Sequence, residues 1–321
     1  MNKSKLNKLF SSEIAIVLVL FLLCIVVSII TPTFATSRNI INLLQRTSTT
    51  GILAVGMTFV IATGGIDLSV GGQVTLMGII MATAFQNGIN TILVMLITLG
   101  LGLVFGLFNG LGVSILKFPP FMVTLALQLI TYGFALYMTE GRSILISVEG
   151  FDVIGLGKVL GIPVPIYFFV IVAIIGILIL KRFTIGRQIL AVGSNAKGAW
   201  YAGINVARTT VIAYVLAGIT ASVTAVILSS RLMSASATLG EDLELDAIAA
   251  VVIGGTSLSG GNGFIFGTVA GSLIIEVITN WMTLQNINPY LRDVVKGAII
   301  LLALLIDNAR RGKLTKNEFA G

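Results

Sequence analysis

Histidine is absent from the 321-residue sequence, and cysteine occurs once, as Cys24. Without histidine the chain lacks the commonest general base and metal ligand of proteins, which argues against an enzyme. A single cysteine cannot form a disulfide framework or a thiolate metal cluster within one copy. Because Cys24 lies inside an apolar run, we interpret it as a lipid-facing or packing residue.

Charged residues are also scarce. They make up 10% of the chain against 56% for hydrophobic residues, and the mean hydropathy is +1.04, whereas a soluble domain is roughly 25% charged. Such a composition indicates an integral membrane protein. A spanning helix needs about 20 apolar residues, so the chain has room for about ten spans and for no sizeable soluble domain. The phosphate-binding pattern GxxxxGK[ST] is missing, which places any ATP hydrolysis through a P-loop on another chain.

The apolar stretches predict an all-α membrane protein in which residues 1–321 form one transmembrane domain. The first stretch is too long for a signal peptide and ends at Thr31-Pro32-Thr33 without a cleavage pattern, so we expect a retained span. Ten helices are predicted, at about 14–30, 43–63, 72–86, 90–116, 120–139, 165–181, 209–230, 245–258, 263–282 and 289–306.

The basic residues predict the orientation. With the N-terminus in the cytoplasm, simple alternation also places the 181–208 loop and the C-terminal tail there, which gives a positive inner side. The inner set is Lys3, Lys5, Lys8, Lys117, Lys181, Arg182, Arg187, Lys197, Arg208, Arg310, Arg311, Lys313 and Lys316. Acidic residues collect on the opposite face, among them Glu241, Asp242 and Glu244. Both termini are therefore expected in the cytoplasm.

A GGxxLSxG pattern occurs twice, at 64–71 and at 254–261, each time where a span is expected to end on the inner side. Transporters are often built from repeats whose broken helices meet near the membrane midplane, so paired glycine interruptions indicate a translocation pathway. In a chain with 36 glycines, chance is the alternative. The pattern nevertheless predicts broken or re-entrant glycine-rich segments.

Asp67 is the one acidic residue between Val55 and Ile80, and a carboxylate at membrane depth costs roughly 2.5 to 3.5 kcal/mol. Asp67 or Ser69 can cap the following helix, or the segment can shape a passage for a polar substrate. Asn109 and Gln128 can offer amides to substrate hydroxyls or bond neighbouring helices, which is the commoner use. The candidate path residues are Gly64, Gly65, Asp67, Ser69, Asn109, Gln128, Gly254, Gly255 and Ser257.

Two rows of glycine, spaced four residues apart, predict close helix packing, with the dimer interface or the pore as alternatives. The rows are Gly102, Gly106 and Gly110, and Gly263, Gly267 and Gly271. Within the ninth and tenth spans, Glu276 and Asp293 are expected to be neutralised by Arg292 and Lys296, since unpaired intramembrane charges are rare.

The polar segment from Gly186 to Arg208 predicts a short helix with Ser194 as N-cap, residues 195–202 as body and Gly203 as C-cap. Small residues on one face and the Trp200-Tyr201 pair suit docking in a partner's groove, with a plain surface loop as the alternative. The candidate docking residues are Gly186, Gly193, Ser194, Asn195, Ala199, Gly203 and Asn205.

Three motifs together resemble the bacterial ribose-type ABC sugar permeases over nearly the whole chain. They are Gly56-Met57-Thr58 through Gly64-Gly65-Ile66-Asp67-Leu68-Ser69-Val70-Gly71; Gly193-Ser194-Asn195 with Gly203-Ile204-Asn205-Val206; and the run from Glu244 to Leu258, Glu244-Leu245-Asp246-Ala247-Ile248-Ala249-Ala250-Val251-Val252-Ile253-Gly254-Gly255-Thr256-Ser257-Leu258.

The resemblance implies a homodimeric or paired permease, a separate ATPase that grips the loop at about 182–208, and an extracytoplasmic sugar-binding protein. It implies no cofactor or metal, and it leaves the sugar open among ribose, xylose, galactose, arabinose and autoinducer-2. Two alternatives compete with it. A secondary transporter needs an ion site, for which Asp67 is the one starting point, and a membrane-embedded enzyme needs a convergent catalytic set that the sequence does not show.

Overall fold

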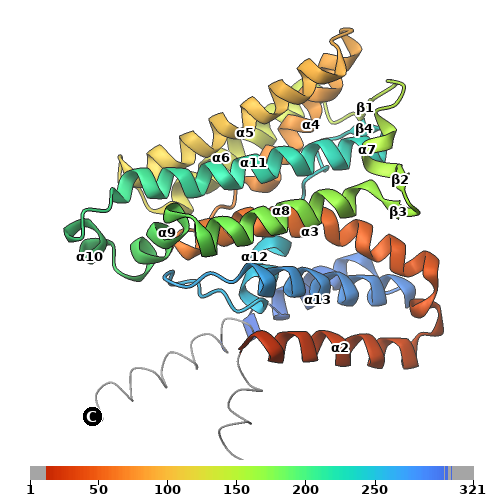
Figure 1. The fold of residues 1–321 in the computed structure, drawn as a ribbon. Coiled ribbons are helices and arrows are strands. Elements are labelled where there is room, and N and C mark those ends of the chain that lie inside the picture. The colour runs from red at the N-terminus through yellow and green to blue at the C-terminus, as the bar shows by residue number, and fades with distance from the viewer. Residues whose placement is uncertain (1–11, 300, 303–304, 306–321) are drawn as a thin grey trace, which may run out of the picture.

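The computed structural model describes residues 12–299, 301–302 and 305. Long helices lie side by side in an elongated bundle (Figure 1). Their bounds are α2 Ser12–Ile30, α3 Ser37–Ala62, α4 Val70–Gln86, α5 Thr91–Ser114, α6 Pro120–Thr139, α8 Val164–Arg182, α11 Val206–Leu232, α12 Leu243–Ile253 and α13 Ile265–Leu284. A further helical stretch covers 289–299. The predicted all-α fold is confirmed for the described residues, which contain only two-residue strands besides helices.

The short elements mark the two ends of the bundle. At one end lie α9 Thr184–Ser194 and α10 Ala196–Tyr201, and we call this the α9–α10 end (Figure 1). At the other, the strand end, lie α7 Asp152–Leu156, an antiparallel pair of β1 Ile144–Leu145 with β4 Ser234–Ala235, and a second of β2 Lys158–Val159 with β3 Ile162–Pro163. A 3-10 turn, η1 Pro32–Ala35, connects α2 to α3.

Five of the described helices, α5, α6, α8, α11 and α13, are long and apolar enough to cross a membrane, and shorter apolar helices cover Ala15–Ile30 and Val70–Gln86. Large apolar side chains remain exposed on their outward faces, for example Ile92 at 74% and Leu129 at 67%. Such surfaces suit lipid and would be costly in water. The structure is therefore that of a multi-pass membrane protein.

The prediction that residues 245–258 form a complete membrane-spanning helix is wrong. Helix α12 has 11 residues, which at 1.5 Å per residue is roughly 16 Å, about half of a 30 Å hydrocarbon core. Gly254 caps its end, and Gly255 follows with a φ of +89°. A non-helical segment, 236–242, connects β4 at the strand end to this half-helix, so the crossing is broken in two.

Glycine contacts hold the bundle together, as predicted. On α5, a side-chain carbon at Gly102 or Gly106 would collide with the backbone of α11, and the same holds at Gly110. Gly267 and Gly271 of α13 lie against the backbone of α12 and its cap in the same way, at Ala250 and at Gly254. Gly263 is wrongly placed in that row, because it lies before α13 begins and meets only side chains. Because lipid supplies no hydrophobic drive for association, such close backbone approach is what lets these helices pack.

Candidate functional site

The two glycine breaks lie against each other. Helices α3 and α12 end at Ala62 and Ile253, and the amide of Gly261 in the second break donates to the Ala62 carbonyl at 3.0 Å. Gly64 and Gly255 both adopt positive φ, +83° and +89°, one residue after a helix C-cap. Gly64 is the first glycine of its motif copy, and Gly255 is the second glycine of the other copy. When the two helix ends are superposed, the two motif copies are therefore shifted by one residue.

A buried polar network surrounds Asp67. The side chains of Asp67, Ser69, Gln73 and Asn109 are all at 0% exposure. Asp67 Oδ1 accepts from the amide of Ser69 at 2.9 Å and from its hydroxyl at 2.6 Å, and Asn109 Nδ2 donates to both carboxylate oxygens at 3.2 Å. Neutral donors therefore compensate the carboxylate, which offsets the cost of burying it.

The capping prediction for this segment is partly wrong. Ser69 is the N-cap of α4, but its side chain makes no capping bond; it instead accepts from Gln73 Nε2 at 2.7 Å and Asn109 Nδ2 at 2.8 Å. Asp67 bonds the amide of Ser69, two residues on, which is the pattern of an Asx turn. The network therefore shapes the break before α4 and does not extend the helix.

The carbonyl of Ile66, inside the same break, is held by two neighbouring helices. Tyr214 of α11 donates its hydroxyl to it at 3.3 Å, and Thr124 of α6 does so at 3.4 Å. Together with Asn109 of α5, three helices therefore fix the loop between α3 and α4. Asp67, Ser69 and Asn109, which the sequence singled out separately, lie together in one network.

Gln128 does not join that network. It lies on α6, and its Nε2 donates to Glu244 Oε1 at 2.7 Å. Glu244 is only 6% exposed, so the expectation that it belongs to an acidic outer surface is wrong. The half-helix begins beside α4, where the amide of Gly240 donates to Thr75 Oγ1 at 2.9 Å. Glu244 is thus a buried polar residue at the start of a broken helix.

The charged residues of the last two spans do not pair as predicted, because Lys296 was expected to neutralise Glu276 or Asp293. Lys296 pairs with Asp246 of α12 at 2.9 Å, which is the ion pair found among the described residues. Glu276 is 8% exposed, and its Oε1 has no hydrogen-bond partner there. The ion pair therefore ties the helical stretch 289–299 to the half-helix.

The segment between α8 and α11 contains two helices where one was predicted. The N-cap of α10 is Asn195, which accepts from the Gly198 amide at 2.9 Å, and Ser194 instead ends α9. Gly203 lies one residue past the C-cap with a φ of +82°, which confirms the left-handed conformation. Asn205 begins α11 by accepting from the Arg208 amide at 2.9 Å.

Helix α9 links this segment to the glycine breaks. A side-chain carbon at Gly193 would collide with the Ala62 carbonyl and with the amide nitrogen of Gly261, so the three backbones are in direct contact. Gly186, in the first turn of α9, is packed in the same way against α8. The end of α9 is therefore seated on both breaks.

Helix α10 presents a different surface. Ala199 is buried at 6% exposure, whereas Trp200 is 65% and Tyr201 81% exposed. The two rings stack edge-on with centroids 5.0 Å apart. Exposed neighbouring aromatic rings are enriched at protein interfaces, so α10 suits a docking contact.

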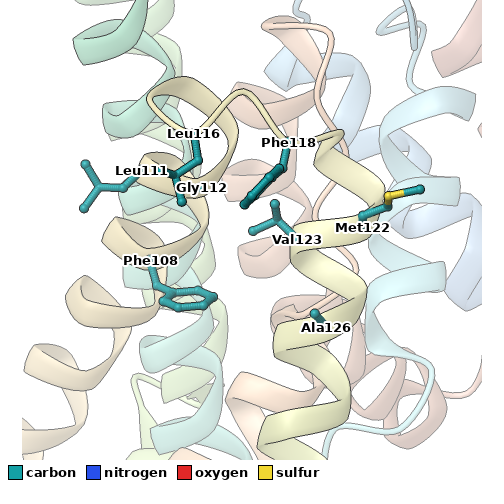
Figure 2. A pocket seen from close by; sticks show the side chains of 8 residues that line it. All are labelled: Phe108, Leu111, Gly112, Leu116, Phe118, Met122, Val123 and Ala126. Carbon is teal, nitrogen blue, oxygen red and sulfur yellow. The ribbon is translucent and has the colours of Figure 1, made fainter.

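A cleft of about 470 Å³ opens between α5 and α6 near the turn that joins them (Figure 2). Its lining is Phe108, Leu111, Gly112, Leu116, Phe118, Met122, Val123 and Ala126. These side chains contain no oxygen or nitrogen, so they offer nothing to a polar substrate. The Asp67 network and the Gln128–Glu244 pair lie elsewhere, around α4 and α12.

A bundle of apolar helices with glycine-broken segments and buried polar groups at the breaks defines the class of multi-pass membrane transporters. The chain matches, over residues 39–304, the family described as "Branched-chain amino acid transport system / permease component". It belongs to this family of transport permeases and is a multi-pass protein of the cytoplasmic membrane.

Among its relatives is the protein named "Ribose import permease protein RbsC" of Bacillus subtilis, 44% identical over 91% of each chain. The protein of that name in Escherichia coli K12 is 38% identical over 91% of this chain and 92% of its own. "Xylose transport system permease protein XylH" of Haemophilus influenzae is 34% identical over 88% and 92%. No solved structure matches the chain. The resemblance to ribose-type ABC permeases is thus confirmed, and the chain is a transport subunit.

Proposed function

We propose that this chain is the membrane subunit of an ATP-driven importer and carries a ribose-like monosaccharide across the cytoplasmic membrane. The observation that carries the proposal is the seating of α9 on both glycine breaks, in a chain 44% identical to a ribose import permease. The proposed partners are a separate ABC ATPase, an extracytoplasmic sugar-binding protein and a second copy of the permease.

In this proposal the α9–α10 end lies in the cytoplasm. The basic residues Lys181, Arg182, Arg187 and Lys197 gather there, in agreement with the positive-inside rule. The strand end then faces the binding protein. The terminal lysines and arginines at 1–11 and 306–321 lie outside the described residues, so orientation rests on this loop and on Lys117.

The proposed mechanism begins at α10, where the ATPase binds the exposed aromatic pair. Movement of α10 is transmitted to α9, because Ser194 ends one helix and Asn195 caps the next. Through Gly193, α9 moves the inner ends of α3 and α12 together, since their breaks are bonded to each other. Rocking of these broken helices alternates access to the polar groups around α4 and α12.

A topology experiment tests the orientation. Ten crossings, with α12 and the segment before it counted as one, return the C-terminus to the cytoplasm. A green fluorescent protein fused after Gly321 is expected to fluoresce, and an alkaline phosphatase fused at the same residue is expected to be inactive. Phosphatase activity there, with no fluorescence, would show that the number of crossings is odd.

Gly203→Val tests the docking assignment. A left-handed conformation costs a residue with a Cβ roughly 1 to 2 kcal/mol, whereas no atom lies within 4 Å of the added carbon, so the effect is on the end of α10 alone. We expect normal membrane insertion and about tenfold weaker co-purification of the ATPase.

The matched control is Gly141→Val, which also has a positive φ, +77°, and open space, but lies at the strand end. Its ATPase association is expected to be normal. Equal co-purification for the wild type and the Gly203 variant would remove α10 from the docking surface.

A further inference from the structure

A second polar cluster, apart from the Asp67 network, lies where two broken helices begin. Helices α4 and α12 start at Val70 and Leu243, and their first turns touch. A side-chain carbon at Gly71 would collide with Glu244 Oε2 and with the Gly240 carbonyl. Two glycines therefore bring two helix N-termini and one carboxylate together, and helix N-termini favour negative or electron-rich groups.

Glu244 is incompletely satisfied in this place. Its Oε1 accepts from Gln128, but its Oε2 is buried without a hydrogen-bond partner, in a residue only 6% exposed. A buried acceptor left without a donor costs about 1 to 3 kcal/mol, and more when it is charged. The free Glu244 Oε2 can therefore accept a hydrogen bond from a bound molecule.

Tyr132 completes the cluster. It lies one turn after Gln128 on α6, and its hydroxyl oxygen, like Glu244 Oε2, is buried without a hydrogen-bond partner among the described residues. Gln128 and Tyr132 are only partly buried, so the cluster is open on the side of α6. Gln128 and Tyr132 come from α6 and Glu244 from α12, and Gly71 of α4 lies against both Glu244 and Gly240 of the segment before α12.

We propose that Gln128, Tyr132 and Glu244 form a contact site for the hydroxyl groups of a monosaccharide during passage. The cluster combines a carboxylate acceptor, an amide that both donates and accepts, and a phenol, and sugar hydroxyls need donors and acceptors together. A metal ion would instead favour several oxygen ligands, yet the side chain beside this carboxylate presents an N–H donor. This site rests on the proposed function, and it is the place on the transport path where the sugar would bind.

The test is Glu244→Gln in the full complex of permease, ATPase and binding protein, reconstituted in proteoliposomes with D-ribose as the probe. ATP hydrolysis stimulated by loaded binding protein is expected to stay within about twofold of wild type, because the α9–α10 end is untouched. Ribose delivered per ATP is expected to fall about tenfold, because the free acceptor becomes an amide. A merely structural role would lower hydrolysis and delivery together.

Two further variants sharpen the result. Glu241→Gln makes the same change three residues away at an exposed position, and its delivery per ATP is expected to match wild type. The exchange of Gln128→Glu with Glu244→Gln keeps one carboxylate and one amide in the cluster, and it is expected to recover most of the lost delivery.

Unchanged ribose delivery per ATP in Glu244→Gln would overturn this site, and so would a parallel loss of hydrolysis and delivery. Failure of the proposed function is distinguishable, because the wild-type complex itself would then deliver no ribose.

Discussion

Gly193→Val is expected to lower sugar uptake about a hundredfold while the ATPase still co-purifies. Valine cannot fit where Gly193 touches the carbonyl of Ala62 and the amide of Gly261, and neither backbone atom can rotate away as a side chain would. Extra side-chain volume in a packed interior typically lowers stability by about 1 to 3 kcal/mol, and by more where the colliding atoms belong to the backbone. Helix α9 would leave the breaks, whereas α10 would keep its own docking surface.

The measurement is uptake of radiolabelled D-ribose, together with ATPase co-purification, at matched levels of membrane protein. Gly100→Val is the matched control, because it also places valine at a helical glycine but has no atom within 4 Å of the added carbon. Uptake by the control is expected to be normal. Full uptake by the Gly193 variant would mean that the contact between α9 and the breaks transmits nothing.

Asp67→Ala is expected to reduce uptake more than a hundredfold. The change leaves the Ser69 amide, the Ser69 hydroxyl and the Asn109 amide without their common acceptor, at about 1 to 3 kcal/mol for each buried donor that stays unpaired. The break between α3 and α4 would then lose its shape. Asp67→Asn keeps one acceptor oxygen, so its loss of uptake is expected to be smaller, about tenfold.

Two variants separate this effect from a general loss of charge. Asp152→Ala removes an exposed carboxylate at the strand end and is expected to leave uptake unchanged. Exchanging the pair, with Asp67→Asn and Asn109→Asp together, restores one carboxylate and one amide, and is expected to regain uptake relative to Asp67→Asn alone. Wild-type uptake by Asp67→Ala would leave the network with no part in transport.

The apolar runs were sufficient to predict most of the helices, because length and hydropathy are local properties of the chain. They were insufficient for α12, since 245–253 is as apolar as a complete span and the break before it is made by contacts with α4. Helix α9 was missed for the opposite reason: its residues are mixed in polarity, and its burial depends on α8, α11 and the end of α3.

At the candidate site, too, the sequence indicated single residues but not the contacts between them. The sequence singled out Asp67 and Asn109 separately, but their contact joins residues 42 positions apart, and no local pattern specifies such a distance. The alternation of spans grouped Glu244 with the acidic residues of the outer side, and only its bond with Gln128 across 116 positions shows that it is buried. A carboxylate immediately before a long apolar run was the signal that could have found it.

The most direct test of the central claim is ribose uptake into proteoliposomes that contain this chain with and without its ATPase, with the binding protein supplied outside and ATP enclosed. A permease subunit of an ATP-driven importer predicts accumulation only when the ATPase, ATP and loaded binding protein are all present, with no response to a proton or sodium gradient. Ribose accumulation by this chain alone, driven by either ion gradient and unaffected by the ATPase, would contradict the account.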